Sequence, residues 1–526
     1  MVLSHDWRLI AALGAAAIAL GVGIVLSPLV ALASLGAVVI IFAGYLFPGS
    51  LTRTFLRLLT LLLLGYAFCD RAFAHIGIGS LYVGEMVLFS GLLSAVTDKR
   101  RFLVFKSPVA WLIAAFMAWG AMRTIPYVPI YGGDALRDAA TWGYALFALL
   151  LAPLIMTSER LAGTLLEKYT RLAPFFLLWA PVGAMISRIY DKYLPKYSAN
   201  GEPLQLMKPG DAAVHLAGIG VLMLLNLHRS RAGQEEADSV PRSHEWLWWL
   251  CWAAGIFTVG NDSRGGMLAV FAALFVAAVL RPIRIGRKLA LVSAIAAALL
   301  MATVVTEFSL TIGKRGRSVS VQQMMDNLQS LNGGGRSDLS NTSQWRLVWW
   351  RKIISYTLHG PFFWTGKGFG VNLAIDDRIR KVGTGHIVRS PHNAHLTFLA
   401  RAGVPGFVLW LVLQTAFGIG MLRAHFRARR MKDGWWERVN LWILAYWISF
   451  LVNATFDVYL EGPQGGIWFW CIVGLGIAAM EVQRQKYGRR ASEYDAFTAK
   501  ARSPSFAVRP SGLRGAPALS ARQHAS

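Results

Sequence analysis

Several basic side chains of this sequence stand where long apolar runs begin or end. Arg137 begins one run, Lys208 precedes another, Arg264 lies in the turn between two runs, and His392 precedes a fourth. Charged groups at the edge of a membrane are costly unless they are paired or hydrated, so each is a candidate for function. A guanidinium stays charged and offers a fork of donors that suits phosphate. Basic groups gathered at one depth therefore predict a site for an anion.

The plainer explanation of any one of these residues is a side chain that reaches toward the membrane interface. Arg264 is the hardest to explain in that way, because its turn is too short to form a solvated loop. Asp262 could pair with it, and Gly265 and Gly266 allow close backbone approach. No cluster of residues has the spacing of metal ligands, so we predict no metal site.

The segment from Ser390 to Gly406 carries the strongest local pattern. His392 and Asn393 are followed, after nine residues, by Gly403 and Gly406 in the order Gly-x-x-Gly. An isolated histidine beside a membrane face is more often structural than catalytic. The ordinary pKa of histidine, near 6.5, nevertheless suits a base that works near neutral pH.

This pattern resembles the signature of the O-antigen ligase family. The superfamily also holds O-antigen polymerases and related transferases of lipid-linked glycans. Ser263-Arg264-Gly265 is similar to the family's Ser-Arg-Gly element, and a large loop with an Arg- and Trp-rich helix precedes His392. Asn453–Asp457 and the turn at Glu461 follow it in the expected order. The resemblance covers about residues 130–480.

The resemblance implies roles for single residues. His392 would accept or orient the proton of an acceptor hydroxyl, with Asn393 beside it. Arg264 and Arg137 would hold a diphosphate and offset its charge as it leaves. Lys208 and Arg346 are weaker candidates for the same task.

The resemblance also implies the substrates and the location. The donor would be a glycan on undecaprenyl diphosphate, and the acceptor a sugar hydroxyl of lipid A-core or of a growing polysaccharide. Such a transfer would use no metal, no other cofactor and no nucleic acid. It would take place at the periplasmic face of the bacterial inner membrane, in lipopolysaccharide or exopolysaccharide synthesis.

The sequence leaves the choice within the superfamily open. One dominant outer loop near the C-terminal end favours a ligase, but a second, modest loop at about 189–210 keeps a polymerase as the alternative. A solute transporter is a rival of another class, and a lipid-binding scaffold in an export complex is a third. Transporters tend to show internal repeats and ionisable groups at mid-membrane depth, whereas here no repeat is evident and the charges lie at the ends of the runs.

Composition agrees with a membrane protein. Of the 526 residues, 55% are hydrophobic and 15% are charged, yet the net charge is +25. Soluble domains carry about 25% charged residues, so a soluble enzyme, a disordered chain and a secreted disulfide scaffold are excluded. The three cysteines lie apart in or beside apolar runs, which is typical of inert small core residues.

The apolar runs predict an all-α polytopic fold with about 12–14 transmembrane helices, each roughly 20 residues long. The candidate spans lie near 8–26, 29–47, 54–70, 80–97, 108–123, 136–157, 168–188, 211–229, 246–260, 264–281, 288–308, 393–422, 439–458 and 464–482. Lys and Arg gather in alternate loops, so both termini are expected in the cytoplasm.

Five regions follow from this pattern. Residues 1–130 are N-terminal spans, 131–308 the ligase-like core, 309–392 a large periplasmic loop, 393–482 C-terminal spans, and 483–526 a disordered basic cytoplasmic tail. Within the loop, Trp345–Ile354 predicts an amphipathic interfacial helix, in which Trp345, Trp349 and Trp350 lie at the lipid interface or stack on sugars. Gly366–Gly370 matches no nucleotide-binding pattern. Asp376 and Asp377, flanked by basic residues, are expected in a solvated stretch.

Overall fold

The structure is a computed structural model. It describes residues 50–78, 81–189, 207–229, 245–260, 262–281, 310–311, 318–319, 337–379 and 389–502. Three predicted spans, at 8–26, 29–47 and 288–308, lie outside these residues, as does most of the first part of the large loop, apart from 310–311 and 318–319. Every other predicted span coincides with a described helix.

The described part is a bundle of helices with four two-residue strands, which pair as β1 (Gly77–Ile78) with β2 (Leu81–Tyr82) and β3 (Leu310–Thr311) with β4 (Ser318–Val319). The α-helices are α3 (Ser50–Ala74), α4 (Val83–Thr97), α5 (Pro108–Thr124), α6 (Val128–Tyr131), α7 (Gly133–Gly143), α8 (Leu146–Met156), α9 (Glu159–Ile189), α10 (Pro209–Leu224), α11 (Glu245–Gly260), α12 (Arg264–Leu280), α15 (Ser337–Leu358), α16 (Leu373–Asp376), α17 (Ala394–Arg430), α18 (Gly434–Ala454) and α19 (Pro463–Arg502). Short 3₁₀ turns connect several of them: η1 (Lys99–Lys106), η2 (Ile125–Tyr127), η3 (Leu227–Arg229) and η5 (Tyr459–Glu461).

The all-α polytopic class is confirmed. Six described helical segments are long and apolar enough to cross a membrane: Leu51–Ala74, Pro108–Tyr131, Gly133–Met156, Arg160–Ser187, Ala394–Arg430 and Pro463–Arg489. Shorter apolar helices at Val83–Val96, Pro209–Leu224 and Arg264–Leu280 pack among them. A helix that is apolar on all sides must be covered by lipid or by other helices.

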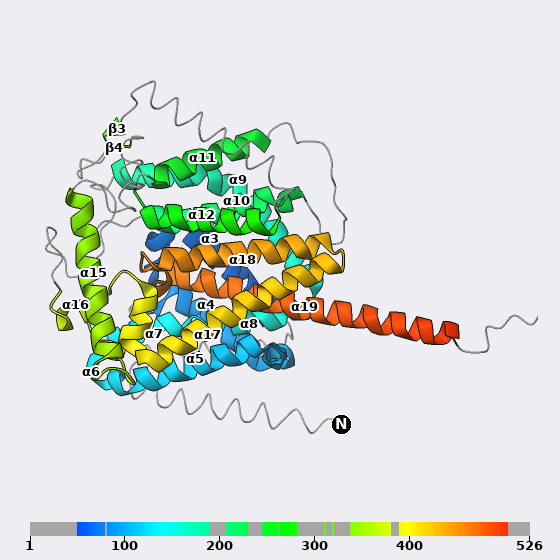
Figure 1. The fold of residues 1–526 in the computed structure, drawn as a ribbon, viewed down its shortest axis with the longest axis horizontal. Helices are drawn as coiled ribbons and strands as arrows, with labels where there is room; N and C mark the ends of the chain where they lie inside the picture. The colour runs from blue at the N-terminus through cyan, green and yellow to red at the C-terminus, as the bar shows by residue number, and fades with distance from the viewer. Residues whose placement is uncertain are drawn as a thin grey trace, which may run out of the picture. The chain divides into compact units, whose positions relative to one another are not determined.

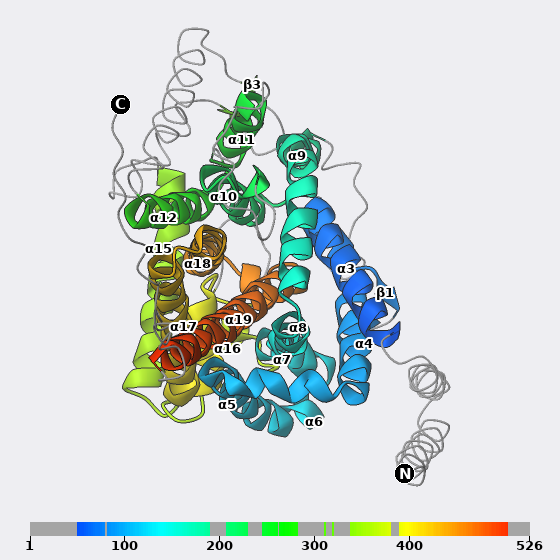
Figure 2. The same ribbon diagram turned by 90° about the vertical axis from the view of Figure 1, so that its right-hand side faces the viewer.

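The first of two compact units, Met1–Val482, holds the bundle. Helices α10, α12 and α18 pack against one another, and α17 packs against α18. Helix α19 runs between this group and the layer formed by α3 and α9 (Figures 1 and 2). Trp468 of α19 donates a hydrogen bond to Leu63 O of α3. In the second unit, Gln483–Ser526, α19 continues to Arg502, so the first part of the expected tail is helical.

Helix caps fix one end of the bundle. Ser263 caps α12 by accepting from Gly266 N, and Asn393 caps α17 by accepting from Leu396 N. Lys208 stands at the N-cap of α10, with Pro209 in the first turn. Such residues end the preceding loop at a defined place. The three caps therefore align residues from distant parts of the sequence at a single end of the bundle.

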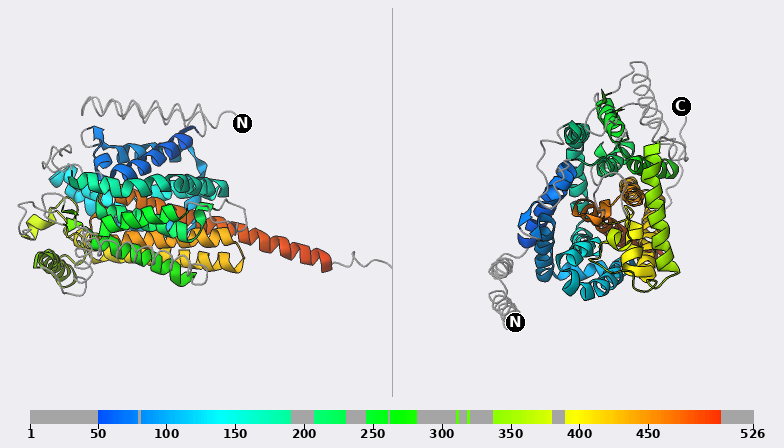
Figure 3. Two further views of the ribbon diagram at one scale, coloured as in Figure 1. Left: turned by 90° about the horizontal axis from the view of Figure 1, so that it is seen from above. Right: turned by 90° about the vertical axis from the view of Figure 1, so that its left-hand side faces the viewer.

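Helix α15 lies across this end (Figures 1 and 3). Trp349 is fully buried and donates its indole N–H to Asp377 Oδ2 at 2.7 Å, and Trp350 donates to Pro391 O at 2.9 Å. Lys367 Nζ pairs with Asp377 at 2.6 Å and also contacts Asp376. The expectation of a solvated stretch is confirmed for Asp376, which is exposed, and is wrong for Asp377, which is the buried partner of two donors. Trp349 and Trp350 therefore tie α15 to Asp377 and to the carbonyl of Pro391.

The glycines of the Gly-x-x-Gly pattern serve backbone packing. At Gly403 the helix α17 breaks, with φ of 70°. The loop before α16 replaces the lost helical bonds, since Lys367 N donates to Ala400 O and Gly368 N donates to Arg401 O. A Cβ at residue 403 would lie 2.6 Å from Phe363 O. Glycine is required here for two reasons, its φ and the close approach of the loop.

We predict that Gly403→Ala lowers the free energy of unfolding by about 1–3 kcal/mol, because strain of this kind is added to a steric overlap. Gly434→Ala is the matched control, since a Cβ at residue 434 meets nothing within 4 Å. Thermal unfolding of the purified variants measures the difference. Equal unfolding midpoints for the two variants would show that the break in α17 does not depend on glycine.

Candidate functional site

A buried group of opposite charges lies at the end of the bundle that α15 covers. Lys208 Nζ contacts Asp457 Oδ1 and lies 3.7 Å from Asp211 Oδ1. The backbone N of Lys208 donates to Asp70 Oδ2 at 2.8 Å. We call these four residues the Asp457 cluster. Lys208, predicted to bind the anion, is thus surrounded by carboxylates of its own protein.

Close backbone packing brings this cluster together. A Cβ at Gly210 would lie 3.0 Å from Ser263 Oγ and 3.3 Å from Asp457 Oδ2. The first turns of α10 and α12 therefore meet the turn between α18 and α19. Asp457 stands in that turn, and Arg264 is the first residue of α12.

Arg346 reaches the same turn from α15. Its Nη1 donates to Phe456 O at 3.1 Å. Phe456 also packs on the start of α12, where a Cβ at Gly265 would lie 2.7 Å from Phe456 Cβ. Burial lowers the pKa of Arg346, Asp457 raises it, and the like charge of Arg264 lowers it further. The guanidinium groups of Arg264 and Arg346 are therefore close enough for their charges to interact, and Asp457 lies within the same electrostatic reach of Arg346.

The environment of Arg346 is incomplete in hydrogen bonds. Its Nε is buried, and none of the residues in the described ranges accepts a hydrogen bond from it. A buried donor without an acceptor is costly. An anion placed between Arg264 and Arg346 would accept from this group and offset the repulsion of the two cations.

His392 adopts a left-handed backbone conformation, with φ of 54°. Its ring centroid lies 5.8 Å from that of Trp345, nearly perpendicular to it. The carbonyl of Pro391 before it is held by Trp350, and Asn393 after it caps α17. Strained residues that persist because their neighbours fix them gather at functional sites.

Asp457 lies within electrostatic reach of His392. Burial alone would raise the pKa of Asp457, but the positive charges of Lys208, Arg71 and His392 lower it to about 2. Asp457 is therefore ionised at every physiological pH.

Arg137 belongs to a second ionic group, which we call the Asp138 network. Asp138 Oδ2 lies 2.8 Å from Arg401 Nη1 and 3.0 Å from Arg389 Nη2. Arg137 is more than half exposed and lies 3.3 Å from Asp134 and 3.7 Å from Asp138. The structure thus gathers His392, Arg264, Lys208 and Arg346 around one turn, with Asn393 next to them, and places Arg137 among other acids.

Two members of this network were missed by the sequence analysis as candidates. Arg401 is buried and also donates to Val371 O at 3.0 Å, and Arg389 donates to Gly370 O at 2.8 Å. Both therefore tie the loop before α16 to α7. The signal that could have revealed them is Asp138 itself, a second acid at the outer end of a predicted span.

Glu461 connects the two groups. It stands in the same turn as Asp457 and accepts from Thr397 Oγ1 at 2.8 Å. Burial raises the pKa of Glu461 to about 7, although the hydrogen bond from Thr397 and the charge of Arg401 oppose the shift. Among the residues that the structure describes, no group of three or more His, Cys, Asp or Glu is placed to hold a metal ion.

Comparison with known families agrees with the resemblance of the sequence. A family model described as O-antigen ligase matches residues 249–411, which confirms the resemblance to the O-antigen ligase superfamily. Arg264, Arg346, His392 and Asn393 lie inside the matched segment, and Asp457 lies beyond it. A search of curated proteins finds no significant match.

We predict that stability depends on pH through Glu461. Burial raises the pKa of Glu461 from 4.5 to about 7. The contribution of its protonated form to the free energy of unfolding is therefore complete below about pH 4.5 and is lost as the pH rises to about 7. In Glu461→Gln, which resembles the protonated acid, this loss is absent. The unfolding midpoint should therefore fall more for the unmodified protein than for the variant between pH 4.5 and 7.5. Parallel pH profiles would contradict the assignment.

Proposed function

We propose that this protein is a glycosyltransferase of the O-antigen ligase type. It moves a glycan from undecaprenyl diphosphate to a sugar hydroxyl of lipid A-core, at the periplasmic face of the inner membrane, with both termini in the cytoplasm. One observation carries the proposal: Arg264, Arg346 and His392 come from three separate elements of the segment that matches the O-antigen ligase model, and all three gather at the turn of Phe456 and Asp457.

Arg264 and Arg346 bind the diphosphate of the donor in this proposal. Their mutual repulsion and the unsatisfied Nε of Arg346 are relieved when an anion lies between them. As the bond from the anomeric carbon to the diphosphate breaks, negative charge grows on the leaving oxygen, and the two guanidinium groups stabilise it. Lys208 supports this site by neutralising Asp457, and Arg137 acts outside it.

His392 acts as the general base. The acceptor hydroxyl oxygen forms a bond to the anomeric carbon of the donor while its proton passes to the imidazole. Polyprenyl diphosphate leaves with the electron pair of the broken bond. Asp457, ionised at neutral pH, stabilises the imidazolium that results through its negative charge.

We predict that His392→Ala, Arg264→Ala and Arg346→Ala each reduce glycan transfer by about 100-fold or more, the usual loss when one stabilising donor is removed. Arg351→Ala is the control for Arg346→Ala, because Arg351 lies on the same helix but is exposed. It should stay within about twofold of the unmodified protein, as surface substitutions usually do. Surface glycan is measured in a deletion strain at matched membrane abundance of each variant.

Full glycan output from His392→Ala or Arg264→Ala would contradict the proposal. An equal loss in Arg351→Ala would indicate that α15 is needed only as a whole.

The phenotype of the deletion strain separates ligase from polymerase. Loss of a ligase leaves full-length polymer on the polyprenyl carrier, and this is the result we expect. A core that carries a single repeat unit would instead identify the protein as a polymerase. Gel electrophoresis of lipopolysaccharide and of the extracted polyprenyl-linked glycan distinguishes the two.

A further inference from the structure

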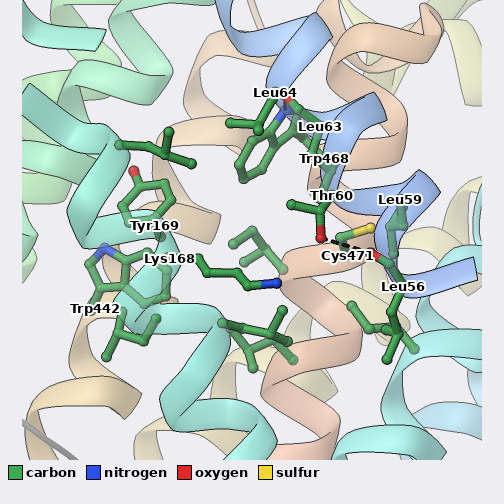
Figure 4. Close-up of a pocket in the computed structure, with 16 residues that line it drawn as sticks. Leu56, Leu59, Thr60, Leu63, Leu64, Lys168, Tyr169, Trp442, Trp468 and Cys471 are labelled. Carbon is green, nitrogen blue, oxygen red and sulfur yellow. Dashed lines mark hydrogen bonds between the residues drawn. The ribbon is translucent and has the colours of Figure 1, made fainter. Parts of the chain in front are cut away.

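A pocket opens between α3, α8, α9, α18 and α19, within the membrane-spanning part of the bundle. It encloses a volume of about 120 Å³. Its walls include Thr60, Tyr169, Trp442 and Trp468, together with several leucines (Figure 4). Among the described residues that line it, Lys168 is the charged one.

Lys168 extends its amine into this space (Figure 4). The neighbouring acid, Glu167, is occupied by Arg171 at a distance of 2.5 Å, and Thr60 Oγ1 donates to Leu56 O. Lys168 itself forms no ion pair with any residue in the described ranges. Lys168 is exposed at the edge of the pocket, and a lysine near a membrane surface attracts anionic lipid headgroups.

Lys168 lies far from the Asp457 cluster along α9. Ser187 of α9 accepts from Met207 N, next to Lys208, and so marks the end that carries the cluster. Lys168 precedes Ser187 by a length of helix of about 28 Å, close to the ~30 Å thickness of a hydrocarbon core. Lys168 therefore lies near the opposite membrane surface.

Side chains close the pocket on the side of the cluster. Trp468 packs against the ring of His215, with centroids 5.1 Å apart. His215 is bonded through its two ring nitrogens to Tyr446 and Tyr459, at 2.6 Å and 2.9 Å. These rings stand between the pocket and the turn of Asp457, so a molecule in the pocket does not reach the arginine pair.

We propose that this pocket binds an anionic phospholipid from the leaflet opposite the Asp457 cluster. Part of one acyl chain lies beside Tyr169, Trp442 and Trp468, and the phosphate pairs with Lys168. The apolar walls and the ammonium group of Lys168 together favour this occupant. The inference goes beyond the proposed glycan transfer and does not depend on it.

Native mass spectrometry of the purified full-length protein tests this inference, with phosphatidylglycerol or phosphatidylethanolamine of identical acyl chains added to a lipid-depleted sample. We expect the tightest-bound lipid to be phosphatidylglycerol, with an affinity about fivefold higher than that of phosphatidylethanolamine, as one lysine near a membrane surface provides. Lys168→Gln should remove this preference, and Lys168→Arg should retain it. Arg171→Gln, on the same helix but paired with Glu167, should also retain it.

A second variant tests the place of the acyl chain. Leu475→Trp fills the pocket and should weaken both lipids at an unchanged unfolding midpoint. The proposal is overturned if the unmodified protein shows no preference, if Arg171→Gln loses it as fully as Lys168→Gln, or if Leu475→Trp binds both lipids as before.

Discussion

The ion pair between Lys208 and Asp457 is the contact around which the charged end of the bundle is arranged. Two charges in an apolar bundle are stable only if each finds its partner, and removal of one partner leaves an uncompensated charge that costs about 3–5 kcal/mol. The pair fixes the start of α10 against the turn between α18 and α19. The side chain of Phe456 in that turn packs on Gly265 of α12. Its carbonyl oxygen accepts a hydrogen bond from Arg346 of α15.

Helix α15 covers this end of the bundle, and hydrogen bonds from its tryptophans to Asp377 and to Pro391 hold it there. Trp349 and Lys367 both bind Asp377, and the loop that carries Lys367 closes over the break in α17 at Gly403. Gly403 of the sequence pattern therefore has a packing role, because its missing side chain lets a loop reach the helix that begins just after His392. In this arrangement His392 of the motif stands at the proposed site, and Gly403 of the same motif serves the packing of the loop.

Much of the fold could be predicted from the sequence, since apolar runs of sufficient length specify helices whatever their neighbours are. The gathering of Arg264, Lys208 and His392 at one end also followed, because alternation of Lys- and Arg-rich loops fixes which ends share a side. The place of Arg137 and the burial of Asp377 could not be predicted in this way. Each depends on a partner hundreds or tens of residues away, Arg389 beside Asp138 and Trp349 beside Asp377, and helix lengths do not reveal which ends are neighbours.

The central claim is that Arg264 and Arg346 bind one diphosphate together. A double-mutant cycle on the affinity of the purified protein for polyprenyl diphosphate tests it most directly, using Arg264→Ala, Arg346→Ala and the double variant. If the arginines share the ligand, each single variant lowers the affinity. The free-energy loss of the double variant then differs from the sum of the two single losses, as it does for residues in contact. Strictly additive losses, or unchanged affinity in either single variant, would contradict the account.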